Sequence, residues 1–117
     1  MSETTHTILQ PGEKVFVIHR PLVHGESRRH FFGVVEDCHG TVARVTGRVF
    51  SADSKNEFTT RDMPRTRIIP LASAGVIVNI LPASVDIDRI TYGYAVGAEG
   101  KLHITDGSTW HLDINPC

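Results

Sequence analysis

The chain has 117 residues, of which 40% are hydrophobic and 21% are charged, and its formal net charge at pH 7 is -1. This length suits one domain, and the composition is that of a folded protein rather than a disordered segment. The near-neutral charge excludes a strongly basic nucleic-acid-binding arm and an acidic tail. We therefore expect a single domain that spans residues 1–117.

The sequence carries no signal for export or membrane insertion. Residues 1–6 lack the basic start and apolar core of a secretory signal. The most apolar window, residues 68–81, is interrupted by polar residues and is shorter than the ~20 residues of a membrane-spanning helix. The two cysteines, Cys38 and Cys117, are too few for a disulfide scaffold. We expect a cytoplasmic protein with no membrane partner.

Runs rich in β-branched and aromatic residues predict three strands in the first half of the chain. The first strand is Lys14–His19 and the second is residues 30–36. Residues 37–40 have the composition of a turn, and residues 41–50 then return as the third strand. The second and third strands are therefore predicted to form a hairpin.

The middle of the chain predicts a loop and two further strands. Residues 51–64 are polar and indicate an exposed excursion, and residues 66–69 form a short strand that ends at a proline. Residues 72–75 are small and predict a bend before a buried strand at Val76–Leu81. Residues 84–89 fit either a strand or one short helical turn capped by Ser84.

The last quarter predicts a strand over residues 90–96 and then a hairpin formed by residues 101–105 and 109–114. A three-residue loop, Asp106-Gly107-Ser108, sorts apolar and polar side chains onto separate faces of this hairpin. In that register His103 lies opposite His111.

No run of ten or more residues has the 3.6-residue period of a helix. Short strands separated by glycine and proline are typical of all-β sandwiches and barrels. We expect an all-β fold in which residues 12–82 form a small closed barrel, because closure removes exposed sheet edges. Residues 83–117 then add a β element that includes the C-terminal hairpin, with at most short helical turns.

Residues 12–82 resemble Sm-like and SH3-like small β-barrel proteins. The resemblance lies in five strands, a long excursion between the third and fourth, and the Ala74-Gly75 bend before the short apolar strand that begins at Val76. It implies a barrel whose fourth and fifth strands pair with a neighbouring subunit in a ring. Residues 37–40 and Ala74-Gly75 stand where Sm proteins carry their RNA-contacting loops. They lack the asparagine and the basic residue of those loops, so uridine binding is not carried over.

Four arginines are candidate ligands for an anion. The two-residue period of the third strand places Arg44 and Arg48 on one face, and Arg28 and Arg29 precede the partner strand. Guanidinium groups bind phosphate and carboxylate groups, so these residues predict a basic surface for a nucleic acid or an acidic protein.

The predicted fourth and fifth strands carry the candidate contacts between copies of the chain. Exposed strand edges are able to pair with another chain, so we expect a homo-oligomer. The residues expected at this interface are Ile68, Ile69, Val76 and Val78.

His103 and His111 are a candidate metal site. Residues that face each other across two strands have Cβ atoms about 4.5–5.5 Å apart, which brings two imidazoles within reach of one ion. The alternative is a solvated pair with no role. The earlier histidines of the chain match no spacing of metal ligands.

Catalysis finds little support in the sequence. No spacing places a nucleophile beside a base, and no pair of carboxylates stands out as acid and base. We interpret the chain as a non-catalytic binding module without a cofactor, which acts through self-assembly or partner binding. The alternatives are a structural subunit of a larger particle, and a barrel that binds a metal or a small molecule through its histidines.

Overall fold

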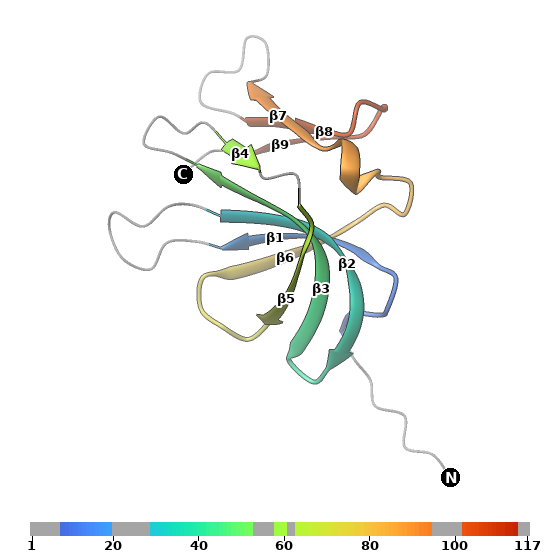
Figure 1. Cartoon of the computed structure of the whole chain (residues 1–117), viewed down its shortest axis with the longest axis vertical. Helices are drawn as coiled ribbons and strands as arrows, with labels where there is room; N and C mark the ends of the chain where they lie inside the picture. Colours follow the sequence, from blue (N-terminus) through green and yellow to red (C-terminus); the bar gives the residue numbers. More distant parts are fainter. Residues whose placement is uncertain (1–7, 20–28, 53–57, 61–62, 95–101, 115–117) are drawn as a thin grey trace. The chain divides into compact units, whose positions relative to one another are not determined.

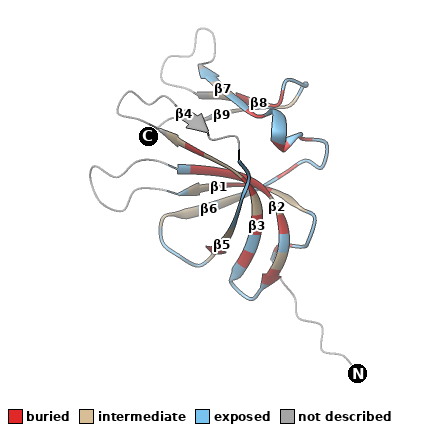
Figure 2. Cartoon of the chain, in the orientation of Figure 1, coloured by how far each residue is buried: buried red, intermediate tan, exposed pale blue. Residues whose placement is uncertain are grey.

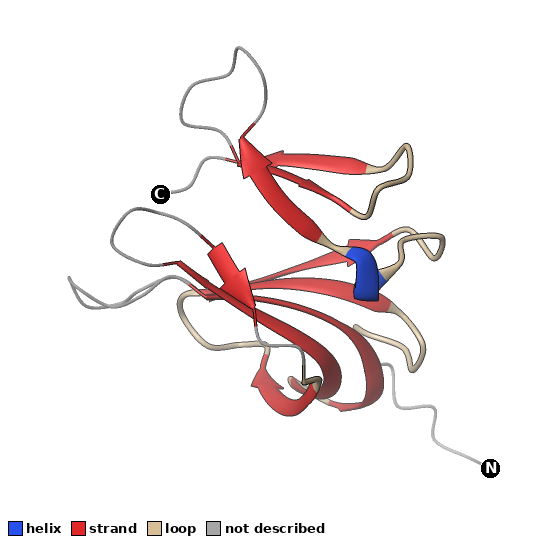
Figure 3. Cartoon of the chain, turned by 45° about the horizontal axis from the view of Figure 1, so that its top comes forward, coloured by secondary structure: helices blue, strands red, loops and turns tan. Residues whose placement is uncertain are grey.

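The computed structural model describes residues 8–19, 29–52, 58–60, 63–94 and 102–114 (Figure 1). The chain divides into two compact units, Met1–Ala83 and Ser84–Cys117. Strands form the framework of both units, and the helical element of the described residues is one short 3-10 turn (Figure 3). The all-β prediction is therefore confirmed. In the described part of the chain, no helix is long and apolar enough to cross a membrane.

The strands of the first unit form one antiparallel sheet. They are β1 (Lys14–His19), β2 (Arg29–His39), β3 (Val42–Ala52), β4 (Phe58–Thr60), β5 (Arg65–Pro70) and β6 (Val76–Leu81). The order is β4-β3-β2-β1-β6, and β5 also pairs with β3. Among the described strands, β5 and β6 each pair along one side only, so backbone pairing does not close this sheet into the expected barrel.

The β2–β3 hairpin is longer than the sequence suggested. The β2 strand continues past residue 36, because the register shifts between Val35 and Asp37 and pairing then resumes as far as His39 and Val42. Such a shift marks a β-bulge. The chain reverses at Gly40, whose φ of 59° is a conformation that favours glycine. Residues 37–39 of the predicted turn are thus paired residues of β2 that follow the bulge.

One face of the first sheet carries the hydrophobic core and is called here the core face. Figure 2 shows in red the buried residues along the strands of this sheet. Alternation along the strands brings its side chains to the same side. The buried members of this cluster are Leu9, Val15, Val17, Phe31, Val35, Cys38, Ala43, Val45 and Ile69.

The opposite face of the same sheet carries a second buried group, called here the aromatic face. Phe16 and Phe32, on neighbouring strands, stack with their ring centroids 4.3 Å apart. Phe50 packs its ring edge-on against Phe32 at 5.7 Å, and His30 does the same against Phe16 at 5.0 Å. Both faces of the central strands are therefore buried, which explains why β1 and β2 read as continuous apolar runs.

The second unit holds the helical turn η1 (Ile87–Arg89) and a three-stranded antiparallel sheet of β7 (Thr91–Tyr94), β8 (Leu102–Thr105) and β9 (His111–Ile114). The turn begins at Asp86, whose side chain accepts a hydrogen bond of 3.1 Å from the backbone N–H of Asp88. The ambiguous segment 84–89 therefore contains a helical turn, and its cap is Asp86 rather than Ser84.

The register of the β8–β9 hairpin differs from the predicted one by two residues. His103 lies opposite Asp113 instead of His111, and the loop runs over residues 106–110. Because side chains alternate with a period of two, a shift of two residues leaves the sorting of faces unchanged. The two registers therefore place the same side chains on the same face, and the pattern of apolar and polar residues does not distinguish them.

Candidate functional site: a pocket around Arg67

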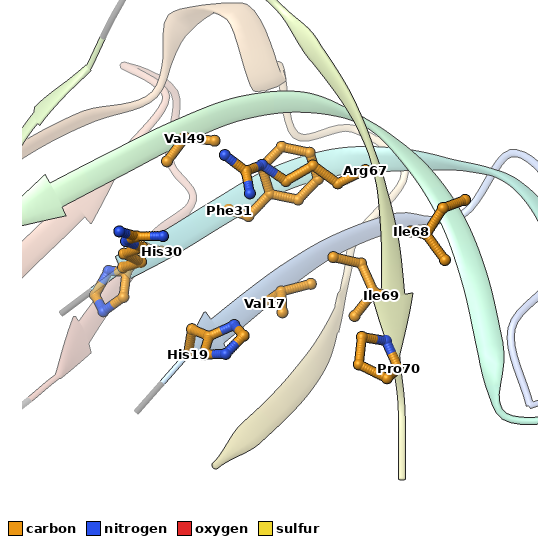
Figure 4. A pocket seen from close by; sticks show the side chains of 10 residues that line it. Val17, His19, His30, Phe31, Val49, Arg67, Ile68, Ile69 and Pro70 are labelled. Carbon is orange, nitrogen blue, oxygen red and sulfur yellow. The ribbon is translucent and has the colours of Figure 1, made fainter. Parts of the chain in front are cut away.

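A pocket of about 210 Å³ opens beside the core of the first unit (Figure 4). Residues of β1, β2, β3 and β5 line it, and we call it the Arg67 pocket. The lining residues are Val17, His19, Arg29, His30, Phe31, Val49, Arg67, Ile68, Ile69 and Pro70.

Strand alternation places an arginine in this apolar setting. Arg67 pairs with Val45 of β3, a core residue, so its side chain leaves the strand on the core face, as does that of Ile69 two residues later. Arg67 is half-buried. In Figure 4 its guanidinium group extends from β5 toward Val49.

The Nε atom of Arg67 is buried and donates a hydrogen bond to no acceptor among the described residues. A buried donor without an acceptor costs about 1–3 kcal/mol, so such donors are rare in folded proteins. The lining residues include no aspartate or glutamate that would pair with the guanidinium. The lining of the pocket thus supplies no carboxylate partner for the Arg67 guanidinium.

Two further basic side chains stand at the edge of the pocket. His19 and Arg29 pair across β1 and β2, and both are exposed. The guanidinium of Arg29 carries a positive charge at neutral pH. Together with Arg67 it gives one part of the pocket a positive potential, while Val17 and Phe31 supply apolar wall.

The structure does not gather the predicted arginines into one surface. Arg28 lies outside the described residues. Arg44 and Arg48 project on the aromatic face, where the Arg48 guanidinium carbon lies 5.2 Å from the centroid of the Phe50 ring, within the range of a cation–π contact. Arg29 pairs with Ser51 and belongs to the core face. Of the three arginines of this set that the structure describes, only Arg29 lines the pocket.

Sequence reasoning missed Arg67. The signal was present, because the two-residue spacing of Arg67 and Ile69 puts both on one face of a strand whose isoleucine is buried. An arginine that shares one face of a strand with core residues indicates a charge held in an apolar setting.

Three of the four predicted interface residues face inward. Ile69 is buried in the core, and Val76 and Val78 are partly buried and pack against it. Ile68 is 58% exposed, and the exposed isoleucines of β6 are instead Ile77 at 38% and Ile80 at 55%. A contact between copies of the chain would therefore use these three isoleucines.

The histidine pair is close but not directly opposed. The rings of His103 and His111 stack diagonally, with centroids 5.2 Å apart, and Nδ1 of His103 lies 2.8 Å from Oδ1 of Asp113. Within the described ranges, no group of three or more histidine, cysteine or acidic residues is arranged to hold a metal ion. The predicted metal site therefore lacks a complete ligand set there.

Comparison with protein families, curated proteins and solved structures found no match to the chain. The resemblance to Sm-like and SH3-like barrels therefore stays an expectation from the strand pattern. The geometry of the Arg67 pocket is the feature from which a function is proposed below.

Proposed function

We propose that the chain is a non-catalytic binding module that accepts an anionic group in the Arg67 pocket. The observation that carries this proposal is the guanidinium-bearing side chain of Arg67, which lines a cavity without carboxylates and whose buried Nε–H has no acceptor among the described residues. The proposal keeps the cytoplasmic location expected from the small number of cysteines.

The energetics favour an anion over a neutral acceptor. A hydrogen bond to a charged group contributes about 1.5–3 kcal/mol, roughly twice the contribution of a neutral pair. Apolar walls around the guanidinium also lower the local dielectric constant, which strengthens its attraction to a negative charge. An anion would both satisfy the Arg67 donor and neutralise its charge.

A nucleic acid is a poorer fit than a small anion. A phosphate backbone is a long charged surface and is bound by several exposed basic side chains along its path. Here Arg29 projects from the core face, whereas Arg44 and Arg48 project from the aromatic face of the same sheet. These three arginines do not offer one continuous path.

The test is a titration of the full chain with phosphate, acetate and benzoate, each at an ionic strength matched with sodium chloride and followed by NMR chemical shifts. We expect at least one of these anions to bind, and its binding to be lost in Arg67→Met. The matched control is Arg65→Met, because Arg65 lies two residues away in β5, is exposed and does not line the pocket. If no anion binds in an Arg67-dependent way, the proposed function is wrong.

A second candidate function, self-assembly, has its own supporting observation. Among the described strands, β5 pairs only with β3 and β6 only with β1, which leaves one edge of each strand without a partner. Ile68, Ile77 and Ile80 are exposed on these two strands. Exposed apolar edges favour pairing with another chain.

Light scattering tests self-assembly. We expect a mass that is a multiple of the 12.9 kDa chain, and a shift toward monomer in Ile77→Lys. Val42→Lys is the control, because Val42 is also exposed and apolar but belongs to β3. A wild-type chain that stays monomeric at high concentration would exclude this second function.

A further inference from the structure

We infer that the ligand of the Arg67 pocket is a small monocarboxylic acid with an apolar body. This inference rests on the proposed function and narrows it, because the proposed function requires only an anion. Three properties of the pocket carry the inference: the number of its enclosed charges, the chemistry of its walls and its size.

The enclosed positive charge of the pocket is balanced by a ligand that carries one negative charge. Arg67 is the half-buried cation of the lining, whereas Arg29 and His19 are exposed. His30 also lines the pocket and is buried, but its ring packs against Phe16 on the aromatic face. A dianion such as phosphate would bring a second charge into the pocket without an enclosed partner, and burying an unpaired charge is costly. The planar guanidinium group presents two parallel N–H donors, which match the two oxygens of a carboxylate.

The walls of the pocket fit an apolar group. Valine, isoleucine, phenylalanine and proline make up most of the lining around the guanidinium. Contact with these walls removes apolar surface of the ligand from water, which contributes about 25 cal/mol per Å². A bare anion such as acetate or phosphate forgoes most of this contribution. The pocket therefore favours a carboxylate that carries a hydrocarbon body.

The size of the pocket limits that body. Its volume of about 210 Å³ is smaller than the ~300–1,000 Å³ of pockets that enclose drug-sized ligands. One aromatic ring or a short branched chain fits this space better than a nucleotide or a long fatty acid. Benzoate is therefore a suitable probe.

The experiment compares the affinity of the wild-type chain for four probes by NMR titration at constant ionic strength. Benzoate carries both features, benzamide lacks the charge, acetate lacks the apolar body, and phosphate replaces the carboxylate. We expect benzoate to bind at least about tenfold more tightly than each of the other three. Relative to benzamide it gains a charge-assisted hydrogen bond, and relative to acetate and phosphate it buries a ring, each of which contributes more than about 1.4 kcal/mol.

The outcomes separate the two proposals. Phosphate or acetate that binds as well as benzoate, and does so through Arg67, overturns the carboxylic-acid inference and leaves the proposed function standing. Benzamide that binds as well as benzoate overturns both proposals, because the anionic charge then contributes nothing. Absence of Arg67-dependent binding for every probe also overturns both.

Variants locate the site. Arg67→Met is expected to weaken benzoate binding at least about tenfold, Arg67→Lys to weaken it less because the charge remains, and Arg65→Met to leave it unchanged. Equal binding by the wild-type chain and a folded Arg67→Met variant contradicts the inference. If Arg67→Met does not fold, the comparison of benzoate with benzamide on the wild-type chain still tests whether the negative charge of the ligand contributes to binding.

The same carboxylate chemistry is presented by a free acid and by the C-terminus of a peptide. N-acetylphenylalanine distinguishes these sources, because its acetylated nitrogen continues in the direction of a peptide chain. Weaker binding than benzoate identifies a free acid as the ligand, and tighter binding identifies a peptide end. Both results support a carboxylate with an apolar body.

Discussion

Gly33 of β2 and Gly47 of β3 lie directly opposite each other at a point where the two backbones leave no room for side chains. A Cβ atom at Gly47 would overlap the carbonyl oxygen of Phe32 and the Cα atom of Gly33. A Cβ atom at Gly33 would lie 2.6 Å from Cγ1 of Val45 and 2.7 Å from the carbonyl oxygen of Thr46. Glycine is therefore required at both positions.

Gly47→Ala is expected to lower the free energy of unfolding by about 1–3 kcal/mol, because the added methyl group forces β2 and β3 apart or distorts their backbones. The midpoint of urea unfolding measures this loss. Gly93→Ala is the matched control, since Gly93 is also a strand glycine but has no atom within 4 Å of the added Cβ. An unchanged midpoint in Gly47→Ala would show that the close approach is not as described.

The carboxylate of Asp106 holds the hairpin loop of the second unit to the segment that starts η1. It accepts hydrogen bonds from the hydroxyl of Ser108 at 2.5 Å and from the backbone N–H groups of Ser108 at 3.0 Å and Asp86 at 2.8 Å. These hydrogen bonds, led by that from the Ser108 hydroxyl, lower the pKa of Asp106 to about 2.

This lowered pKa implies a defined dependence of stability on pH. The folded pKa lies below the value of about 3.9 for an unfolded aspartate, so the contribution is present above about pH 4 and is lost as the pH falls from about 4 to about 2. Asp106→Asn is expected to be less stable than the wild-type chain at pH 7, with a difference that shrinks over this interval. Urea midpoints measured across the pH range provide the check.

Ser108→Ala tests the assigned cause. Removing the hydroxyl is expected to raise the pKa of Asp106 toward its ordinary value, which a carboxyl-carbon NMR titration measures directly. An unaltered titration in this variant would mean that the hydroxyl is not the main cause of the shift.

The His103–Asp113 contact is expected to be a weak surface interaction. Both side chains are partly exposed, at 36% and 40%, so solvent screens their attraction. A double-mutant cycle of His103→Ala and Asp113→Ala is expected to give a coupling energy of about 0.2–1 kcal/mol in urea unfolding. A coupling well above that range would indicate that this pair, rather than hydrophobic packing, maintains the hairpin.

The sequence predicted the strands well because their boundaries are marked by local chemistry. The predicted bounds of β1 and β6 agree with the structure, since proline or glycine lies close to both ends of each run. The predicted β8–β9 register was wrong because registers that differ by two residues place the same apolar and polar side chains on the same faces. The five-residue loop is held by hydrogen bonds to the carboxylate of Asp106. One of the donors is the backbone N–H of Asp86, which lies 20 residues away in sequence.

The candidate site was harder to predict than the fold, because a pocket depends on residues from strands far apart in sequence. Arg44 and Arg48, which the sequence predicted as anion ligands, lie on the face of the sheet away from the pocket. Arg67 differs from them because it shares a strand face with Ile69 and because its Nε atom is buried. The burial of this atom follows from tertiary packing and is not visible in the sequence.

The most direct test of the central claim observes the Nε–H group of Arg67 itself. Its NMR signal, assigned by its loss in Arg67→Met, is expected to shift progressively as benzoate is added, while the Nε–H signal of Arg65 stays in place. Titrations with benzoate, acetate and phosphate that leave the Arg67 signal unmoved for every anion, or that always move both signals equally, would contradict an anion-binding role for this pocket.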